Sequence, residues 1–318
     1  MGRKFSFLCM SLLLVTFVVP VSSFGGDNKA ILRLALLPIP DVLPVYVALE
    51  KGYFKELGVT VEPLSVGSAL ERDQLMQAGK VDGMINEISG AANFNRDKTQ
   101  VKIISVARSP IGDNPLFRIL AAPGSGITTV AGLAGVPIGI SKNTVIEYIS
   151  TRLLTTGGLT NEEIEYKSIP VLPERLQLLL QGQIKAVTLP DPLGAAAIKA
   201  GAIEVVNDTD RRDVSASVIT FSTDSLENKT DLVKKFMIAW EKAAQDLNQD
   251  PAAYEELMLK KIRVPKNIQG EFAIPPMPIK ALPTKAQWDD VMAWMVERKL
   301  LAGPLVYEES VSSAFLPK

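Results

Sequence analysis

The chain of 318 residues contains no histidine, and its single cysteine is Cys9. Histidine is the usual general base, the commonest metal ligand and the partner of a serine or cysteine nucleophile. A zinc site without imidazole or thiolate would need carboxylates alone, which is rare. GxSxG, P-loop and GxGxxG patterns are also missing from the sequence. We therefore expect no catalytic residue, no metal ligand and no cofactor.

Polar residues follow several of the segments that the sequence pattern indicates as strands. In an open α/β sheet, ligands bind at the carboxyl ends of the strands. Ser68 and Thr144 would each begin a helix, and the free N–H groups of such a helix could face an anion or a polar carbonyl. The ligand-binding candidates are Pro40, Asp41, Ser68, Ala69, Arg72, Asn86, Glu87, Ser141, Asn143, Thr144 and Asp191.

Each candidate also has a purely structural interpretation. Ser68 and Thr144 could serve only as helix caps, which most helices need wherever they point. Arg72 could bind an anion bidentately, but the more ordinary arrangement is a solvated surface cluster with its acidic neighbours. Asp41 and Glu87 could bind an amine or ring N–H group, or could cap local backbone.

Four further residues near these segments are weaker candidates. Tyr46 and Phe94 could stack on a ring, although core packing is the more common role for an aromatic residue. Arg108 and Arg118 lie near the segments that would carry the chain between two lobes.

Apolar periodicity predicts the scaffold that positions these residues, because strand-like and helix-like segments alternate along most of the chain. We expect strands at residues 32–37, 59–65, 81–85, 101–106, 117–121, 136–140, 166–169, 184–189, 203–206 and 217–221. A long amphipathic helix is expected at 231–247, followed by helices at 252–262 and 284–299. The fold class is therefore α/β.

Several motifs resemble those of the solute-binding proteins of ABC importers, in the nitrate/sulfonate/taurine and thiamine-precursor group. Residues 46–62 read YVALEKGYFKELGVTVE, which is similar to the family's opening helix and second strand. Residues 133–141 (LAGVPIGIS), 179–187 (LLQGQIKAV) and the C-terminal residues 307–317 match later family segments. The resemblance covers nearly the whole chain after the leader.

The resemblance implies a two-lobe periplasmic-binding-protein type II fold, with discontinuous lobes joined by hinge strands. Lobe one would comprise residues 24–117 and 217–318, and lobe two residues 118–216, with the C-terminal helices packed on lobe one. It also implies that the protein captures a small polar or anionic solute, such as a sulfonate, a nitrate-like anion or a pyrimidine or thiamine precursor. An ABC permease would be the partner, and the protein would be a monomer.

The N-terminus predicts export. Arg3 and Lys4 precede an apolar run that ends near small residues suited to cleavage, so residues 1–23 are expected to be a signal peptide. The alternative is an uncleaved anchor. We expect a periplasmic or otherwise secreted protein. Its 34 basic and 35 acidic residues offer no basic excess for nucleic-acid binding.

Two alternative functions remain open on sequence grounds. Some relatives are enzymes on the same fold that act on a pyrimidine-type substrate, but the thiamine-pyrimidine synthases use a cysteine-rich motif and a histidine that this chain lacks. A ligand sensor that docks on a receptor would have the same sequence features as a transport protein.

Overall fold

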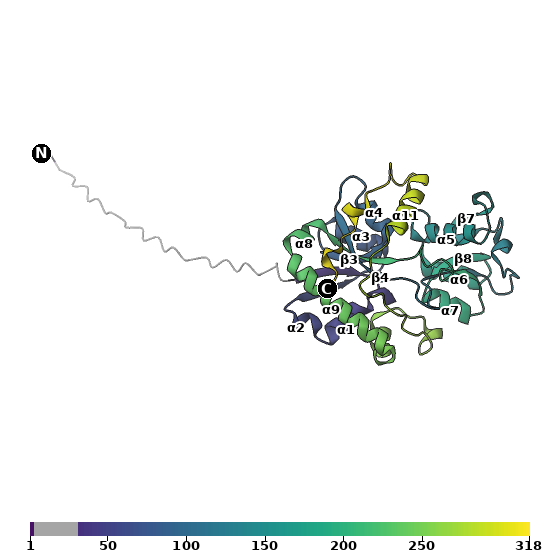
Figure 1. Cartoon of the computed structure of the whole chain (residues 1–318), viewed down its shortest axis with the longest axis horizontal. Helices are drawn as coiled ribbons and strands as arrows, with labels where there is room; N and C mark the ends of the chain where they lie inside the picture. Colours follow the sequence, from purple (N-terminus) through teal and green to yellow (C-terminus); the bar gives the residue numbers. More distant parts are fainter. Residues whose placement is uncertain (3–30) are drawn as a thin grey trace.

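The computed structural model describes residues 1–2 and 31–318, which form two α/β lobes side by side (Figure 1). The predicted signal peptide falls almost entirely outside the described residues. Among residues 1–2 and 31–318, the helices are all too short or too polar to cross a bilayer.

Each lobe is built on one five-stranded sheet. Sheet one has the strand order β2-β1-β3-β10-β4, and sheet two has the order β7-β6-β8-β5-β9. In both sheets the first three strands are parallel, and the strand that follows them is antiparallel. The strands are β1 (Ile31–Leu36), β2 (Thr60–Ser65), β3 (Gly83–Glu87), β4 (Val101–Arg108), β5 (Phe117–Ala121), β6 (Ile138–Ile140), β7 (Tyr166–Ser168), β8 (Ala186–Pro190), β9 (Ile203–Asn207) and β10 (Ser217–Ser222).

Every strand expected from the sequence overlaps a strand of the structure. Two segments cross between the sheets: residues 109–116 lead from β4 to β5, and residues 208–216 return the chain from β9 to β10. The discontinuous two-lobe fold predicted from the sequence is therefore confirmed.

Helices cover both faces of each sheet (Figure 1). They are α1 (Leu43–Glu50), α2 (Tyr53–Glu56), α3 (Ala69–Gln77), α4 (Ile88–Phe94), α5 (Val145–Thr156), α6 (Leu172–Leu180), α7 (Leu193–Lys199), α8 (Thr223–Asn228), α9 (Thr230–Gln249), α10 (Glu255–Lys261), α11 (Lys285–Glu297) and α12 (Tyr307–Ser310). A single 3₁₀ turn, Val130–Leu133, precedes β6.

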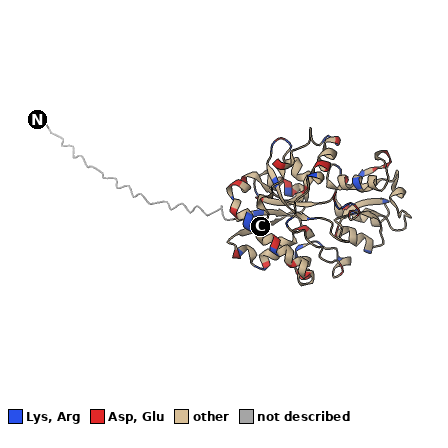
Figure 2. Ribbon diagram, viewed as in Figure 1, with Lys and Arg blue, Asp and Glu red and all other residues tan. Residues whose placement is uncertain are grey.

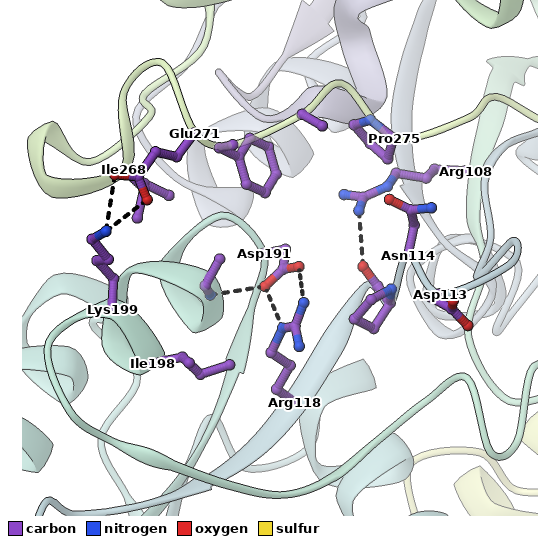
Figure 3. Close-up of a pocket in the computed structure, with 14 residues that line it drawn as sticks. Arg108, Asp113, Asn114, Arg118, Asp191, Ile198, Lys199, Ile268, Glu271 and Pro275 are labelled. Carbon is purple, nitrogen blue, oxygen red and sulfur yellow. Dashed lines mark hydrogen bonds and ion pairs between the residues drawn. The ribbon is translucent and has the colours of Figure 1, made fainter.

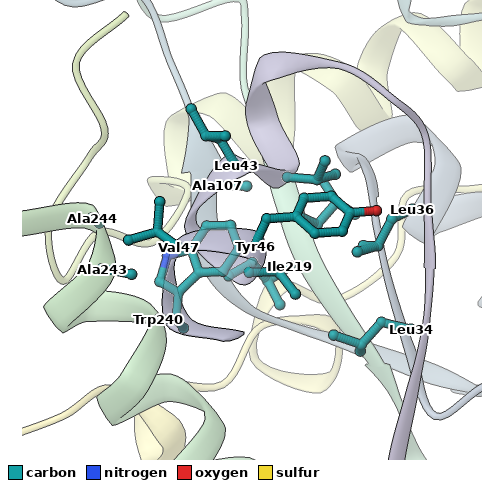
Figure 4. Close-up of a cluster of buried hydrophobic side chains, with 14 of the residues drawn as sticks. Leu34, Leu36, Leu43, Tyr46, Val47, Ala107, Ile219, Trp240, Ala243 and Ala244 are labelled. Carbon is teal, nitrogen blue, oxygen red and sulfur yellow. The ribbon is translucent and has the colours of Figure 1, made fainter. Parts of the chain in front are cut away.

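The core of lobe one lies where α1 and α9 pack on sheet one (Figure 4). Trp240 of α9 is fully buried beside Val47 of α1, and Phe236 stacks on Phe54 with ring centroids 5.5 Å apart. The sequence predicted α9 as an amphipathic helix, because it repeats apolar residues at helical spacing.

The C-terminal helices pack on lobe one, as predicted, but α11 also contacts lobe two. Asp290 accepts hydrogen bonds from Tyr148 Oη at 2.6 Å and from Arg152 Nε at 2.9 Å, both on α5. Trp294 packs edge-on against the Tyr148 ring, with centroids 5.6 Å apart. One apolar cluster therefore runs from α11 into lobe two.

Candidate functional site

A pocket of about 320 Å³ lies between the two lobes (Figure 3). Its walls come from the end of β4, the crossing segment, β5, α7 and the loop that follows α10. The lining residues are Arg108, Asp113, Asn114, Pro115, Arg118, Asp191, Ala195, Ile198, Lys199, Ile268, Glu271, Phe272, Ala273 and Pro275. A second hollow of about 440 Å³ lies within lobe one, between α1, α2 and β2, and has Lys55 as its single charged lining residue. The inter-lobe pocket is the better candidate because both lobes and several charged groups meet there.

Arg118 and Asp191 form a bidentate ion pair in the pocket wall. Arg118 Nε and Nη2 lie 2.8 and 2.9 Å from the two carboxylate oxygens, and Arg118 Nη1 also pairs with Glu204. Burial alone would lower the pKa of Arg118, but the hydrogen bonds and charges of both carboxylates outweigh it and raise that pKa. Gly194 is required beside this pair, because a β-carbon there would lie 2.8 Å from Arg118 Cδ and from Asp191 Oδ1.

Arg108 forms another part of the wall, and its guanidinium points toward the interior of the pocket (Figure 3). The side chain is only 3% exposed and meets Asp41 at 3.4 Å, while Nη2 donates to Pro115 O at 2.9 Å. Pro40 and Asp41 belong to a buried 3₁₀ turn directly after β1. Asp41 thus stands beside the pocket as a partner of Arg108.

The other lobe-one candidates lie at the start of α3 and the end of β3. Ser68 Oγ accepts from Glu71 N at 3.2 Å, so it caps α3 as the structural interpretation proposed, and Ala69 is the exposed first residue of that helix. Arg72 is 2% exposed and pairs with Glu87 at 3.3 Å. The prediction of a solvated cluster around Arg72 is therefore wrong, since its charge is buried against the end of β3.

Asn86 is almost fully buried at the end of β3, where its Oδ1 accepts a hydrogen bond from Thr220 Oγ1 at 2.6 Å. Tyr46 lies in the core of lobe one and Phe94 packs against the core of the α11 side. Core packing, the alternative to stacking on a ligand, is thus the role that the structure gives both aromatic residues.

The lobe-two candidates surround the loop between β6 and α5. Thr144 caps α5 by accepting from Ile146 N at 3.2 Å, and it donates to Ser141 O at 2.7 Å. Asn143 is exposed with a φ of 59°, and its N–H donates to Glu147 at 2.6 Å. Within the described residues, no hydrogen bond or ion pair joins this group to the lobe-one candidates.

Sequence reasoning missed Arg175, which lies fully buried in α6 beneath this loop. Its guanidinium donates to Ser141 Oγ at 2.6 Å, to Thr188 O at 2.7 Å and to Ile169 O at 2.8 Å. Burial lowers the pKa of Arg175 to about 10, and within the described residues no carboxylate pairs with it. An arginine within an otherwise leucine-rich helix was the only available signal.

The paired lobes, the two crossing segments and the pocket between the lobes define the fold of periplasmic binding proteins. Solved structures share this fold. The aliphatic sulphonate binding protein SsuA of Escherichia coli is 15% identical, and the match covers 91% of this chain and 94% of that one with a TM-score of 0.75. The alkanesulfonate-binding protein SsuA of Xanthomonas axonopodis pv. citri, solved with MOPS, is 16% identical over 89% and 98% of the two chains, with a TM-score of 0.72.

A zinc-bound ligand-binding component of an ABC-type import system from Staphylococcus aureus is also similar. It is 14% identical over 90% of this chain and 97% of that one, with a TM-score of 0.73. No curated protein matches the chain by sequence. The NMT1/THI5-like family model matches residues 39–254, which is more than half of the chain, so this protein belongs to the NMT1/THI5-like family.

Proposed function

We propose that the protein is an extracytoplasmic solute-binding protein, which captures a small polar or anionic solute between its lobes and delivers it to an ABC permease. The observation that carries this proposal is the pocket of about 320 Å³ whose walls come from both lobes. Solute-binding proteins close two lobes around a ligand, and hinge segments absorb the motion. The three solved structures described above are named for ligand binding or import, which supports the same role.

The proposal includes the lobe boundaries and the cellular context. Residues 24–117 with 217–318 would move as lobe one and residues 118–216 as lobe two. The protein would act as a monomer after export and signal-peptide cleavage. Binding without catalysis is favoured because the sequence lacks histidine and has its single cysteine near the N-terminus.

Native mass spectrometry of protein purified without refolding tests the proposal directly. We expect a bound low-molecular-weight solute, or a rise in melting temperature when a broad panel of metabolites is screened. Failure of every solute to bind would refute the role. Uptake of the identified solute by cells with and without the gene then separates transport from sensing, because a sensor would leave uptake unchanged.

A further inference from the structure

Two helices of this fold begin with the same kind of hydrogen bond, one in each lobe. At the start of α3, Glu71 accepts a hydrogen bond from Gly67 N at 2.7 Å. At the start of α5, Glu147 accepts one from Asn143 N at 2.6 Å. In both helices the glutamate is the third residue and reaches back to the backbone before the cap, much as the glutamate of a capping box does. The two glutamates therefore have the same local role.

The surroundings of the two glutamates differ. Glu71 is exposed at the surface of lobe one. The Glu147 side chain is only 3% exposed, and its second oxygen pairs with the guanidinium of Arg298. Arg298 is the C-cap of α11, a helix that packs on lobe one. One buried carboxylate thus joins a backbone N–H group of lobe two to a charged residue of lobe one.

This contact lies where the N-terminal end of α5 meets the C-terminal end of α11 (Figure 1). A helix carries partial positive charge at its N-terminus and partial negative charge at its C-terminus, so Glu147 and Arg298 each sit at the favourable helix end. A buried carboxylate that loses its charged partner is strongly destabilised. Without Arg298, we expect the Glu147 carboxylate to turn toward water, which weakens its bond with Asn143 N.

The bond from Asn143 N holds the loop between β6 and α5. Asn143 has a φ of 59°, a left-handed conformation that asparagine tolerates but that must be held by its surroundings. Thr144 Oγ1 donates to Ser141 O at 2.7 Å, and Arg175 donates to Ser141 Oγ at 2.6 Å. Those two bonds lie within lobe two, whereas the carboxylate of Glu147 connects the loop to lobe one.

We propose that Glu147 and Arg298 are positioning residues through which lobe one sets the conformation of the 141–144 loop. While α11 lies against α5, Arg298 fixes the Glu147 carboxylate, and the carboxylate holds the Asn143 N–H group. A displacement of α11 releases the carboxylate and with it the loop, which carries three of the ligand-binding candidates named from the sequence. The inference goes beyond the proposed function and stands without it, because it concerns the protein without solute.

Hydrogen exchange of single backbone amides, measured by NMR on the full chain without solute, tests this coupling. Arg298→Gln should accelerate exchange of the Asn143 amide about fivefold or more, because its bond to Glu147 opens more often. The Gly67 amide, which Glu71 holds in lobe one, is the internal control and should exchange at the wild-type rate. Arg298→Lys keeps the positive charge and should restore the Asn143 rate to within about twofold of wild type.

Two further variants show whether Arg298 acts through the carboxylate. Glu297→Gln is the matched control, since it removes an exposed charge next to Arg298, and it should leave the Asn143 rate unchanged. Glu147→Gln keeps an acceptor for Asn143 N but removes the charge. In the Glu147→Gln background, Arg298→Gln should have little further effect on the Asn143 rate, because the two residues act as one unit.

An unchanged Asn143 rate in Arg298→Gln would overturn the inference. Equal acceleration at Asn143 and Gly67 would overturn it as well, because it would indicate a loss of global stability rather than of one contact. An undiminished effect of Arg298→Gln in the Glu147→Gln background would show that the carboxylate is not the link. None of these outcomes bears on solute binding, which native mass spectrometry tests separately.

Discussion

Replacing Asp290 with asparagine tests whether α11 holds the two lobes together. The Asp290 carboxylate receives three hydrogen bonds from α5 of lobe two: one from Tyr148 Oη at 2.6 Å, and two from Arg152 Nε and Nη2 at 2.9 Å each. Asparagine has nearly the same shape but no charge, so the bidentate arrangement with Arg152 is lost. The change therefore removes an inter-lobe contact with little alteration of packing.

The expected loss of stability follows from the number and exposure of these bonds. A hydrogen bond to a charged group contributes about 1.5–3 kcal/mol when it is well buried. The Asp290 side chain is 39% exposed and that of Arg152 is 21% exposed, so water screens the pair. We therefore expect Asp290→Asn to reduce the free energy of unfolding by about 1–2 kcal/mol in total.

Equilibrium urea unfolding measures this loss, with hydrogen exchange to locate it. The matched control is Asp289→Asn on the same helix, because Asp289 pairs with Lys285 at 2.6 Å within α11 and both side chains are more than half exposed. We expect the control to change stability by less than about 0.5 kcal/mol. Amides of α5 should exchange faster only in Asp290→Asn. Equal unfolding free energies and equal exchange in the two variants would refute the inter-lobe role.

Three further changes test other contacts. Gly83→Ala should destabilise the protein by about 1–3 kcal/mol in thermal unfolding, because the added β-carbon would lie 2.9 Å from two core side chains. Gly67→Ala is the control and should be nearly neutral, because its added β-carbon would lie 3.5 Å from the nearest atom. Burial raises the pKa of Asp208 to about 6 from 3.8. The stability that its protonated carboxyl contributes is therefore full below pH 4 and is lost as the pH rises through 6. Over that range the free energy of unfolding of the wild type should fall by at most about 3 kcal/mol relative to Asp208→Asn, and parallel pH profiles of the two proteins would contradict this. Lys199→Gln removes the exposed ion pair between Lys199 and Glu271, which joins the two lobes. Without ligand, small-angle scattering should then give a larger radius of gyration, while the free energy of unfolding changes by less than about 1 kcal/mol. An unchanged radius of gyration would show that the pair does not hold the lobes together.

The fold could be predicted because apolar alternation and helical periodicity indicated the strands and helices, and the family motifs implied two lobes. The site could be predicted only in part. Ser68 and Thr144 were found as helix caps from local spacing, and Asp191 was placed beside the pocket. The burial of Arg72 and the Arg108–Asp41 contact depend on residues far apart in the chain, and one sequence gives no information about such pairs. The charges spread over both lobes likewise gave no local signal (Figure 2).

The contacts between the lobes differ on the two sides of the crossing segments, and this difference indicates how a solute could enter. On the α11 side, Trp294 and Tyr148 belong to a continuous apolar cluster, whose exposure to water would cost about 25 cal/mol for each Å². On the pocket side, α7 meets the 266–275 loop through the exposed pair of Lys199 and Glu271 and through one hydrogen bond, from Asn267 Nδ2 to Ala196 O at 2.9 Å. Its apolar contact there comes from the small side chains of Ala195 and Ala196, which pack with the lobe-one cluster. An exposed pair contributes at most about 1 kcal/mol. The lobes should therefore separate first between α7 and this loop, with the α5–α11 contact as the pivot, and that motion uncovers the wall that contains Arg108.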